Sequence, residues 1–223
     1  MPSGTRLMAQ LIHDSIYYRS IKGCYDMDLT VHALDPSRLP HFMDLFENRA
    51  FSDNPDWAGC YCVFNYFGDS DDSWESRTAA ENRATAADMI SKGTMNGYLA
   101  YDGDLPIGWC NAGAKEAYKR FDGLFPSPDN SSRICAVTCF VIAPEYRRMG
   151  VARALLDYAA IDLAAQGFDI FEAYPSLSAE SCAAHYHGYP AMYKAAGFAE
   201  HMIQDNFACM RKQLKEVQNV SAE

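Results

Sequence analysis

Long apolar runs are missing from this chain. No stretch of its 223 residues approaches the roughly 20 consecutive apolar residues that are needed to span a bilayer. Residues 1–22 mix charged with apolar side chains, unlike a secretory signal. We therefore expect a cytoplasmic protein that has no membrane partner. Apolar residues still make up 49% of the sequence and aromatic residues 13%, which is enough for one well-buried domain.

Positive charge is also scarce. The chain has 19 Lys and Arg against 29 Asp and Glu, which gives a net charge of -10. This balance argues against a nucleic acid as the partner and favours a small cationic molecule. Residues 51–76 hold acidic side chains and no basic one. That segment either attracts a protonated amine or is a solvated loop, as most charge runs are.

Several common motifs for phosphates and metals do not occur. A Walker loop ends in Gly-Lys-Ser/Thr, and a dinucleotide fingerprint needs three glycines with an acidic residue about 20 residues later. The eight cysteines are scattered and lack the C-x-x-C spacing of a zinc knuckle, so we expect free thiols and no metal. Cys60 and Cys62 would join a metal site only if the fold brought His185 and His187 to them.

One stretch, residues 139–156, does carry chemistry: an apolar strand, a turn and the start of an amphipathic helix. Gly150 and Ala152 leave the first helical turn almost without side chains, so its unpaired N–H groups can meet an anion. Three arginines add cationic donors: Arg147, Arg148 and Arg153. This pattern predicts a site for a phosphorylated cofactor. The alternative is that the small residues only let the helix pack closely on a strand.

Two motifs resemble those of the GNAT acetyltransferases. The spacing Arg147-x-x-Gly150-x-Ala152 is similar to the Q/R-x-x-G-x-G/A signature with which that family binds acetyl-CoA, and residues 193–198 are similar to its Y-x-x-x-G-F segment. The resemblance implies acetyl-CoA as co-substrate. It also implies direct transfer of the acetyl group, through a tetrahedral intermediate, to a primary amine of a small cationic molecule. The alternative is a non-catalytic acyl-CoA-binding or sensing module.

The resemblance further implies an α/β (α+β) fold with a mixed, mostly antiparallel central sheet, helices flanking it and a β-α-β core for acetyl-CoA. The expected elements follow that order. An Asp-Gly turn predicts a hairpin between two of the strands. Strands are expected at residues 29–34, 97–101, 107–114, 134–142, 169–174 and within 198–212, with helices from 36, over 75–92, after 150 and over 191–196.

We expect a single domain over residues 28–215, preceded by an arm at 1–27 and followed by a tail at 216–223. The arm is predicted to be helical or irregular and to cover the domain or a second copy of the chain in a homodimer. An aromatic, cysteine-rich insertion at about residues 50–76 is longer than a minimal family member requires. We therefore expect substrate choice to reside there.

The resemblance implies site residues on both sides of the cofactor. It carries the role of general acid for the departing thiolate onto Tyr193, for which simple packing is the alternative. Contacts to the cofactor are implied for the strand end and the turn: Phe140, Val141, Ile142, Arg147, Arg148, Met149, Gly150, Val151, Ala152 and Arg153. Four aromatic residues are expected either on the acceptor side or in a satellite core: Trp57, Tyr61, Phe64 and Tyr66.

The acceptor amine, with a pKa of about 10.4 in water, must lose a proton before it attacks. Glu172 is our candidate base, since strand alternation could aim it at the cleft; His185, His187 and the acidic residues after Phe51 are alternatives. A cysteine nucleophile at Cys135 or Cys139 would need a low-pKa thiol beside a base. An apolar strand offers the opposite environment, so direct transfer is expected.

Overall fold

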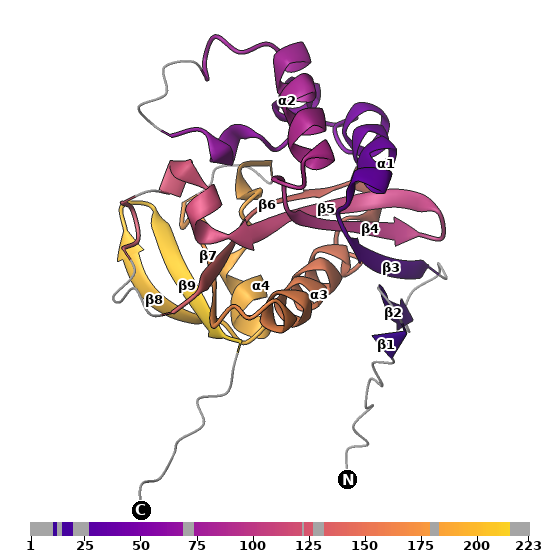
Figure 1. Ribbon diagram of the computed structural model, residues 1–223. Helices are drawn as coiled ribbons and strands as arrows, with labels where there is room; N and C mark the ends of the chain where they lie inside the picture. Colours follow the sequence, from indigo (N-terminus) through magenta and orange to yellow (C-terminus); the bar gives the residue numbers. More distant parts are fainter. Residues whose placement is uncertain are drawn as a thin grey trace, which may run out of the picture.

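A nine-stranded sheet with helices on both faces organises the chain (Figure 1). The computed structural model describes residues 11–12, 15–19, 27–68, 74–121, 123–126, 132–178 and 183–214. The strand order is β1-β2-β3-β4-β5-β6-β7-β9-β8. All neighbouring strands run antiparallel except β6 and β7, which are parallel. The mixed, mostly antiparallel sheet predicted from the sequence is confirmed.

The element bounds are as follows. The strands are Leu11–Ile12 (β1), Ser15–Arg19 (β2), Asp28–Ala33 (β3), Gly97–Asp102 (β4), Leu105–Ala114 (β5), Ile134–Ile142 (β6), Ile170–Ala173 (β7), Ala199–Gln204 (β8) and Phe207–Gln213 (β9). The α-helices are Leu39–Asp44 (α1), Ala79–Ser91 (α2), Val151–Ala165 (α3) and Pro190–Ala195 (α4), and Leu45–Arg49 (η2) is a π-helical turn. Short 3₁₀ turns lie at Pro36–Arg38 (η1), Pro55–Cys60 (η3), Phe64–Tyr66 (η4), Lys115–Ala117 (η5), Lys119–Phe121 (η6), Pro144–Tyr146 (η7) and Ala183–His185 (η8). Within these ranges no helix is both long and apolar enough to cross a bilayer.

Helix α3 covers one face of the sheet because apolar residues recur along it at helical spacing. Val151, Leu155, Ala159 and Leu163 are buried against residues of β3 to β6. Truncation of a fully buried leucine such as Leu155 costs about 2–5 kcal/mol. The helix that opens with the small-residue turn is therefore anchored firmly, and its N-terminus is held at a fixed place beside the end of β6.

Helices α1 and α2 cover the opposite face (Figure 1). Helix α2 begins at Ala79 rather than near Glu75, because Thr78 and Glu81 form a capping box in which each side chain accepts from the other's backbone N–H. Phe42 and Ile90 from these helices pack in one core with Trp109 of β5. The cysteine-rich insertion packs against the sheet in the same core cluster as these helices.

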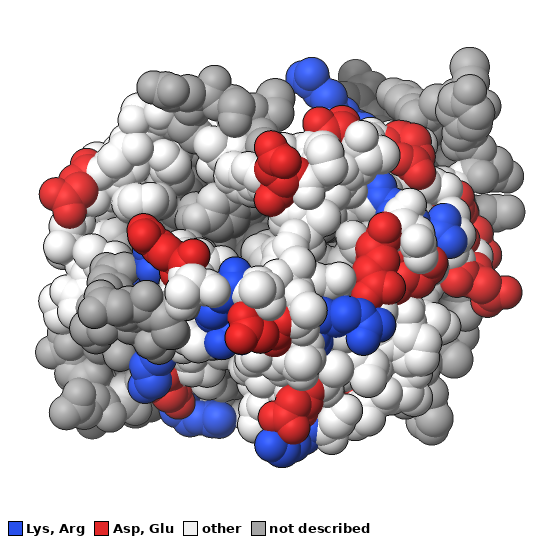
Figure 2. Space-filling view, turned by 90° about the horizontal axis from the view of Figure 1, so that it is seen from above, with Lys and Arg blue, Asp and Glu red and all other residues white. Residues whose placement is uncertain are grey.

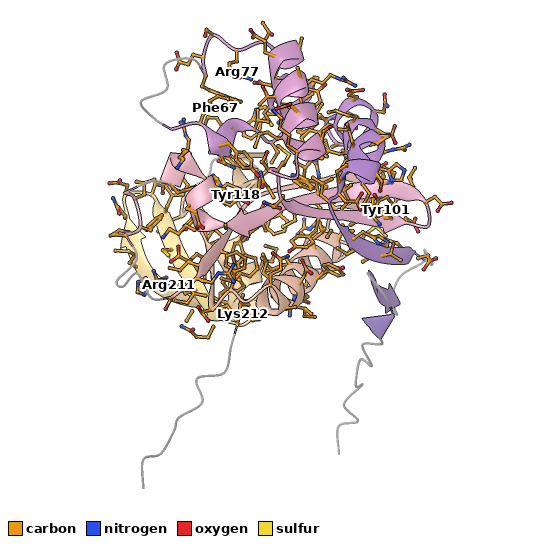
Figure 3. The ribbon with its side chains drawn as sticks, in the orientation of Figure 1. Phe67, Arg77, Tyr101, Tyr118, Arg211 and Lys212 are labelled. Carbon is orange, nitrogen blue, oxygen red and sulfur yellow. The ribbon has the colours of Figure 1, made fainter. Side chains whose placement is uncertain are left out.

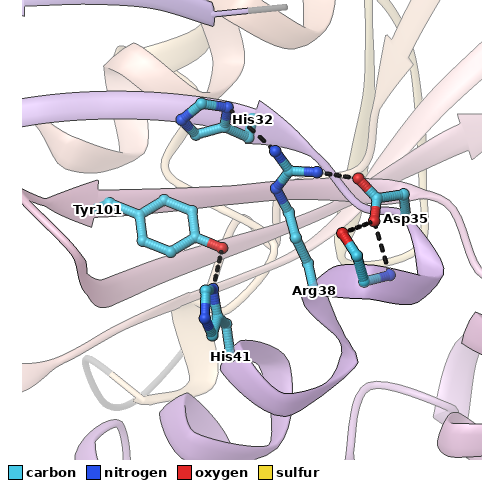
Figure 4. A network of polar contacts seen from close by, with 6 residues as sticks. His32, Asp35, Arg38, His41 and Tyr101 are labelled. Atoms are coloured by element: carbon cyan, nitrogen blue, oxygen red, sulfur yellow. Dashed lines mark hydrogen bonds and ion pairs between the residues drawn. The ribbon is translucent and has the colours of Figure 1, made fainter.

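A polar network joins β3 to α1 (Figure 4). The carboxylate of Asp35 accepts from the backbone N–H of Ser37 at 2.7 Å and pairs with Arg38, whose guanidinium also lies 3.4 Å from His32 Nδ1. His41 Nδ1 lies 3.0 Å from the Tyr101 hydroxyl of β4. These contacts fix the start of the helical layer, as the Asp35-Pro36 sequence predicts.

The sheet opens between β6 and β7. β6 pairs with β7 only over residues 134–137, whereas it pairs with β5 up to Ile142. The β5–β6 register shifts at this point, since Asn111 faces Cys139 but Ala112 faces Val137. An extra residue on one strand of a pair bends that strand and increases its twist. The last part of β6 therefore presents one edge that β7 does not cover.

The N-terminal arm differs from our expectation where it is described. Leu11–Ile12 and Ser15–Arg19 are strands, and β2 continues the sheet by pairing with β3, with Ile16 opposite Val31. The prediction of a helical or irregular arm is wrong for these residues. The spacing of apolar residues misled it, because short apolar runs fit both helix and strand periods. The tail at 216–223 lies outside the described residues.

Candidate functional site

A cleft of about 1420 Å³ lies beside the open edge of β6. Four parts of the chain line it: the end of β6, the turn that leads into α3, the cysteine-rich insertion, and residues 185–192. On the face that carries α1 and α2, acidic and basic side chains are interspersed rather than gathered into one patch (Figure 2). The cleft itself is lined mainly by apolar and aromatic groups, which is typical of small-molecule sites.

The turn into α3 presents bare backbone to the cleft. Gly150 has φ +91°, in the left-handed region that favours glycine, and a Cβ built there would meet nothing within 4 Å. No side chain caps the helix. The N–H groups of its first turn therefore lack both intrahelical and side-chain acceptors, and the helix dipole adds partial positive charge. Of the ten residues assigned to the cofactor, all but Met149 line the cleft.

Two of the three arginines are already engaged. Arg147 forms an ion pair with Asp53 of the insertion and donates from Nε to the Ile142 carbonyl at 3.1 Å. Its hydrogen bonds hold the pKa of Asp53 below the ordinary value. Arg153 donates to Asp157 at 2.7 Å and to the Ala195 carbonyl at 2.8 Å. Arg147 thus ties the insertion to the turn.

The open edge of β6 is met by residues 186–188. The N–H of Phe140 donates to the Tyr186 carbonyl at 2.7 Å, and His187 Nδ1 lies 2.7 Å from the Thr138 carbonyl. Tyr193 is fully buried and donates its hydroxyl to the His187 carbonyl at 2.6 Å. Burial raises the pKa of Tyr193 well above the ordinary value. The Tyr193 side chain, expected to face the reacting thioester, is not among the groups that line the cleft.

Glu172 also lies outside the lining of the cleft. Its buried carboxylate pairs with Lys115 at 2.8 Å and accepts from the Tyr174 hydroxyl at 2.5 Å. It also pairs at 2.6 Å with Arg211 of β9, which Figure 3 labels. Burial by itself raises the pKa of Glu172, but the bonds from Lys115 and Tyr174 and the two positive charges outweigh it, so the pKa is lowered. Glu172 therefore belongs to a buried ion cluster and not to the lining of the cleft.

The two histidines are placed differently. His185 lines the cleft, and its Nδ1 is buried with no hydrogen-bond partner in the part of the chain that the structure describes. Its ring stacks on Tyr189 with the centroids 4.0 Å apart. His187 is 4% exposed and is not among the residues that line the cleft, and burial lowers its pKa to about 4. Of the two histidines, His185 is therefore the candidate base, because it lines the cleft and its Nδ1 is not engaged by another described residue.

The four aromatic residues divide evenly. Trp57 and Phe64 line the cleft, and Trp57 meets Tyr186 edge-on at 5.7 Å. Tyr61 and Tyr66 are not in the lining: their hydroxyls donate to Glu47 at 3.4 Å and to Asn111 at 3.1 Å. The satellite-core alternative describes the packing of these two tyrosines.

One polar residue in the insertion was missed by sequence reasoning. Asn65 lines the cleft, is 2% exposed, and its Oδ1 has no hydrogen-bond partner among the described residues. A buried acceptor of this kind is costly unless a ligand or water satisfies it. The signal in the sequence is an amide between two aromatic residues, Phe64 and Tyr66, a weak one because asparagine is common in turns.

The cysteine-rich insertion places thiols in the same cleft. Cys60, Cys62 and Cys139 line it, and none of them is in a disulfide. Over the described parts of the chain, no group of three or more His, Cys, Asp or Glu side chains is arranged to hold a metal ion. Although His185 lines this cleft with Cys60 and Cys62, His187 does not.

In this mixed α/β fold, the open edge of β6 and the uncapped start of α3 form one cleft that suits an anionic ligand. The model of the Acetyltransferase (GNAT) family matches residues 53–198, and the chain belongs to this family. It is thus an acyltransferase with acetyl-CoA as co-substrate. A sequence comparison with curated proteins gives no match.

Solved structures agree on the fold. The PaiA N-acetyltransferase of Thermoplasma acidophilum, solved with coenzyme A, is 16% identical, with 84% of this chain and 99% of that chain covered and a TM-score of 0.51. The ribosomal-protein-S18-alanine N-acetyltransferase of Escherichia coli is 16% identical, with 87% and 99% covered and a TM-score of 0.50. The yncA protein of Salmonella typhimurium, solved with acetyl-CoA, is 12% identical, with 85% and 96% covered and a TM-score of 0.50.

Proposed function

We propose that this chain is an N-acetyltransferase that moves the acetyl group of acetyl-CoA to a primary amine of a small molecule. The observation that carries the proposal is that one cleft joins a bare helix start at Gly150 to an aromatic wall holding an unpartnered amide oxygen, Asn65 Oδ1. The first feature suits a diphosphate and the second an amine. Cytoplasmic location, a homodimer and the single-domain boundaries stay predictions from the sequence.

On the cofactor side, the backbone N–H groups of Val151, Ala152 and Arg153 are proposed to hold the diphosphate. They point from the uncapped end of a 15-residue helix, where the dipole favours negative charge. The space where a Cβ of residue 150 would lie is empty, so a bulky anion can approach the main chain. Arg148 lines the same end of the cleft and adds a cationic donor.

On the acceptor side, the proposed substrate contacts are Asn65, Trp57 and Phe64, with Trp74 completing the wall. Asn65 Oδ1 can accept a hydrogen bond from the amine, and aromatic faces attract a cation. Phe64 and Trp74 pack edge to face with centroids 4.8 Å apart. In the described lining, the carboxylate of Asp53 is paired with Arg147. An amine bearing one charge and an apolar body suits this wall.

For the protons, we propose His185 as the base and keep Tyr193 as the acid. His185 lines the cleft with a buried nitrogen that has no partner. The amine attacks the thioester carbonyl directly, and the tetrahedral intermediate collapses with the thiolate of coenzyme A leaving. Tyr193 can protonate that thiolate only after residues 186–188 leave β6, because its hydroxyl now donates to the His187 carbonyl. Glu172 is assigned to the ion cluster with Lys115 and Arg211.

The test is release of free thiol from acetyl-CoA in the presence of an amine panel that includes arylalkylamines, polyamines, amino acids and aminoglycosides. Turnover with an N-acetylated product, identified by mass, supports the proposal. Calorimetric binding of acetyl-CoA without turnover on any amine would instead support the non-catalytic acyl-CoA-binding module. Absence of binding would reject both.

A further inference from the structure

Three thiols stand in the wall of the cleft and take no part in the proposed transfer. Cys60 and Cys62 come from the end of η3 and the turn after it, and Cys139 comes from β6. None of the three forms a disulfide within the described residues, and the Cys62 backbone nitrogen lies 3.4 Å from the Cys60 sulfur. The fold has therefore gathered soft, oxidisable groups from sequence positions far apart.

Asn111 orients the Cys62 side chain. It lies on β5 directly opposite Cys139, and its Oδ1 accepts from the Tyr118 hydroxyl at 3.0 Å and the Tyr66 hydroxyl at 3.1 Å. Because both bonds go to the oxygen, the amide nitrogen faces Cys62, where it lies 3.1 Å from the carbonyl oxygen and 3.4 Å from the sulfur. The Cys62 sulfur thus has a fixed N–H donor.

Cys139 and Trp109 lie in the same buried core cluster as Cys62, and both act on the pKa of its sulfur. Trp109 is fully buried, and its Nε1 makes no formed hydrogen bond. A buried N–H without an acceptor is unusual in native structures. A negatively charged sulfur would supply the acceptor that a neutral thiol supplies only weakly.

The three thiols therefore differ in proton affinity. Burial by itself raises the pKa of Cys62, but the neighbouring polar groups of Cys139, Asn111 and Trp109 outweigh burial and hold that pKa below the ordinary value. The hydrogen bond to Cys62, together with burial, raises the pKa of Cys139 well above normal, and burial raises the pKa of Cys60 to about 12. Of the three thiols, Cys62 therefore loses its proton most readily, and Cys139 in the same core cluster holds its proton more firmly.

We propose that Cys62 is a peroxide-reactive thiol whose oxidised form is resolved by Cys139 into a disulfide. The Cys62 thiolate attacks one oxygen of hydrogen peroxide, an S–O bond forms as the O–O bond breaks, and the released hydroxide leaves as water after taking a proton. The Cys139 sulfur then attacks the sulfenic sulfur, an S–S bond forms, and the hydroxyl leaves with the Cys139 proton as a second water. Two thiols lose two electrons in total and the peroxide gains them.

The disulfide would change the cleft. It would join the turn at Cys62 to β6 one residue before Phe140, with the sulfur atoms drawn to about 2.05 Å. Cys62 lines the cleft and is 2% exposed, so a small oxidant such as hydrogen peroxide would approach it from the cleft. Thiols with stabilised thiolates beside a resolving cysteine are the ones that oxidise reversibly. This proposal concerns the thiols alone and does not depend on the proposed acetyl transfer.

The test is peptide mapping of the full-length protein. The reduced protein is treated with an equimolar amount of hydrogen peroxide, alkylated and digested, and we expect one linked pair, Cys62 with Cys139, that dithiothreitol reverses. In Cys139→Ser, dimedone should trap a sulfenic acid at Cys62. In Cys62→Ser, peroxide consumption should fall by about tenfold or more, because the thiolate is the nucleophile.

The matched control is Cys209→Ser, since Cys209 is buried on β9 and is not among the residues that line the cleft. It should form the same disulfide at the wild-type rate. The proposal is overturned if peroxide oxidises the cysteines to similar extents, if the bond joins any other pair, or if Cys62→Ser consumes peroxide as fast as wild type. The wild-type map needs no variant, so a folding defect cannot hide the answer.

Discussion

The main-chain N–H of Phe140 donates to the main-chain carbonyl of Tyr186 at 2.7 Å. That N–H belongs to the strand end whose backbone, by resemblance, contacts the cofactor. In this arrangement the Tyr186 carbonyl accepts from a backbone N–H that the resemblance assigns to the cofactor. Residues 186–188 are further held by contacts from His187 to Thr138 and from Tyr193 to the His187 carbonyl.

Binding of coenzyme A should therefore release residues 184–189. Hydrogen–deuterium exchange followed by mass spectrometry is expected to show faster exchange in that segment and slower exchange at residues 150–153, where the backbone N–H groups gain an acceptor. Residues 97–102 of β4, away from the cleft lining, serve as the internal control and should not change. Protection of residues 184–189 on binding would mean that the segment closes on the cofactor instead.

Gly150→Glu should abolish binding of acetyl-CoA. The new side chain would place bulk and negative charge where the diphosphate is proposed to lie, and the residue would still have to adopt φ +91°. Gly103→Glu is a matched control, since Gly103 has φ +58°, open space around its would-be Cβ, and a position in the β4–β5 turn. Calorimetry should show wild-type affinity for the control. Equal affinity in both variants would reject the site.

Tyr193→Phe should lower kcat by about tenfold or more while affinity for coenzyme A changes little, because a general acid contributes mainly in the transition state. Loss of the hydrogen bond to His187 should also cost about 1 kcal/mol of stability. Tyr98→Phe is the control: its hydroxyl donates to Asp162 at 2.9 Å, away from the cleft lining. That variant should lose stability but keep kcat. Unchanged kcat in Tyr193→Phe would leave Tyr193 a packing residue.

His185→Gln should lower kcat by about 100-fold near neutral pH, within the range of general-base contributions. The deficit should shrink as the pH rises toward the pKa of the amine, because free amine then needs no base. His201→Gln is the control, since His201 is exposed on β8 outside the cleft lining. A deficit that stays constant with pH would indicate that His185 positions the substrate rather than removing its proton.

The strands and helices that the sequence predicted well are those with local signals. β6 has the predicted bounds of residues 134 and 142, and the Asp-Gly turn joins β4 to β5. Alternation, turn residues and a capping glycine act over a few residues, so they can be read without the fold. The turn around Gly150 was also predicted from local signals, and it lines the cleft.

The parts that sequence reasoning placed poorly depend on contacts between distant segments. Glu172 lies on a strand as expected, but Lys115 and Arg211, far away in the chain, hold its carboxylate. Tyr193 is turned inward by the carbonyl of His187. Periodicity predicts the face of a strand or helix on which a side chain lies. It does not predict which distant residue contacts that side chain.

Glu172→Gln should destabilise the protein and leave kcat of the folded enzyme unchanged. The change leaves Lys115 and Arg211, with side chains 15% and 11% exposed, without their counter-charge, which typically costs about 3–5 kcal/mol. The folded pKa of Glu172 lies below the 4.5 of an unperturbed carboxyl. The stabilising contribution is therefore complete above about pH 4.5 and is lost as the pH falls through the folded pKa.

Urea unfolding measured from pH 7 to pH 3 tests both parts of the Glu172 prediction. The wild type should lose stability relative to Glu172→Gln as the pH falls below about 4.5, so that the two curves converge, because a protonated carboxyl resembles the amide. Glu116→Gln is a suitable control: it lies in η5, beside Lys115, and outside the cleft lining, and should leave the pH profile unchanged. A large loss of kcat in Glu172→Gln, with parallel stability curves at every pH, would restore Glu172 as the catalytic base.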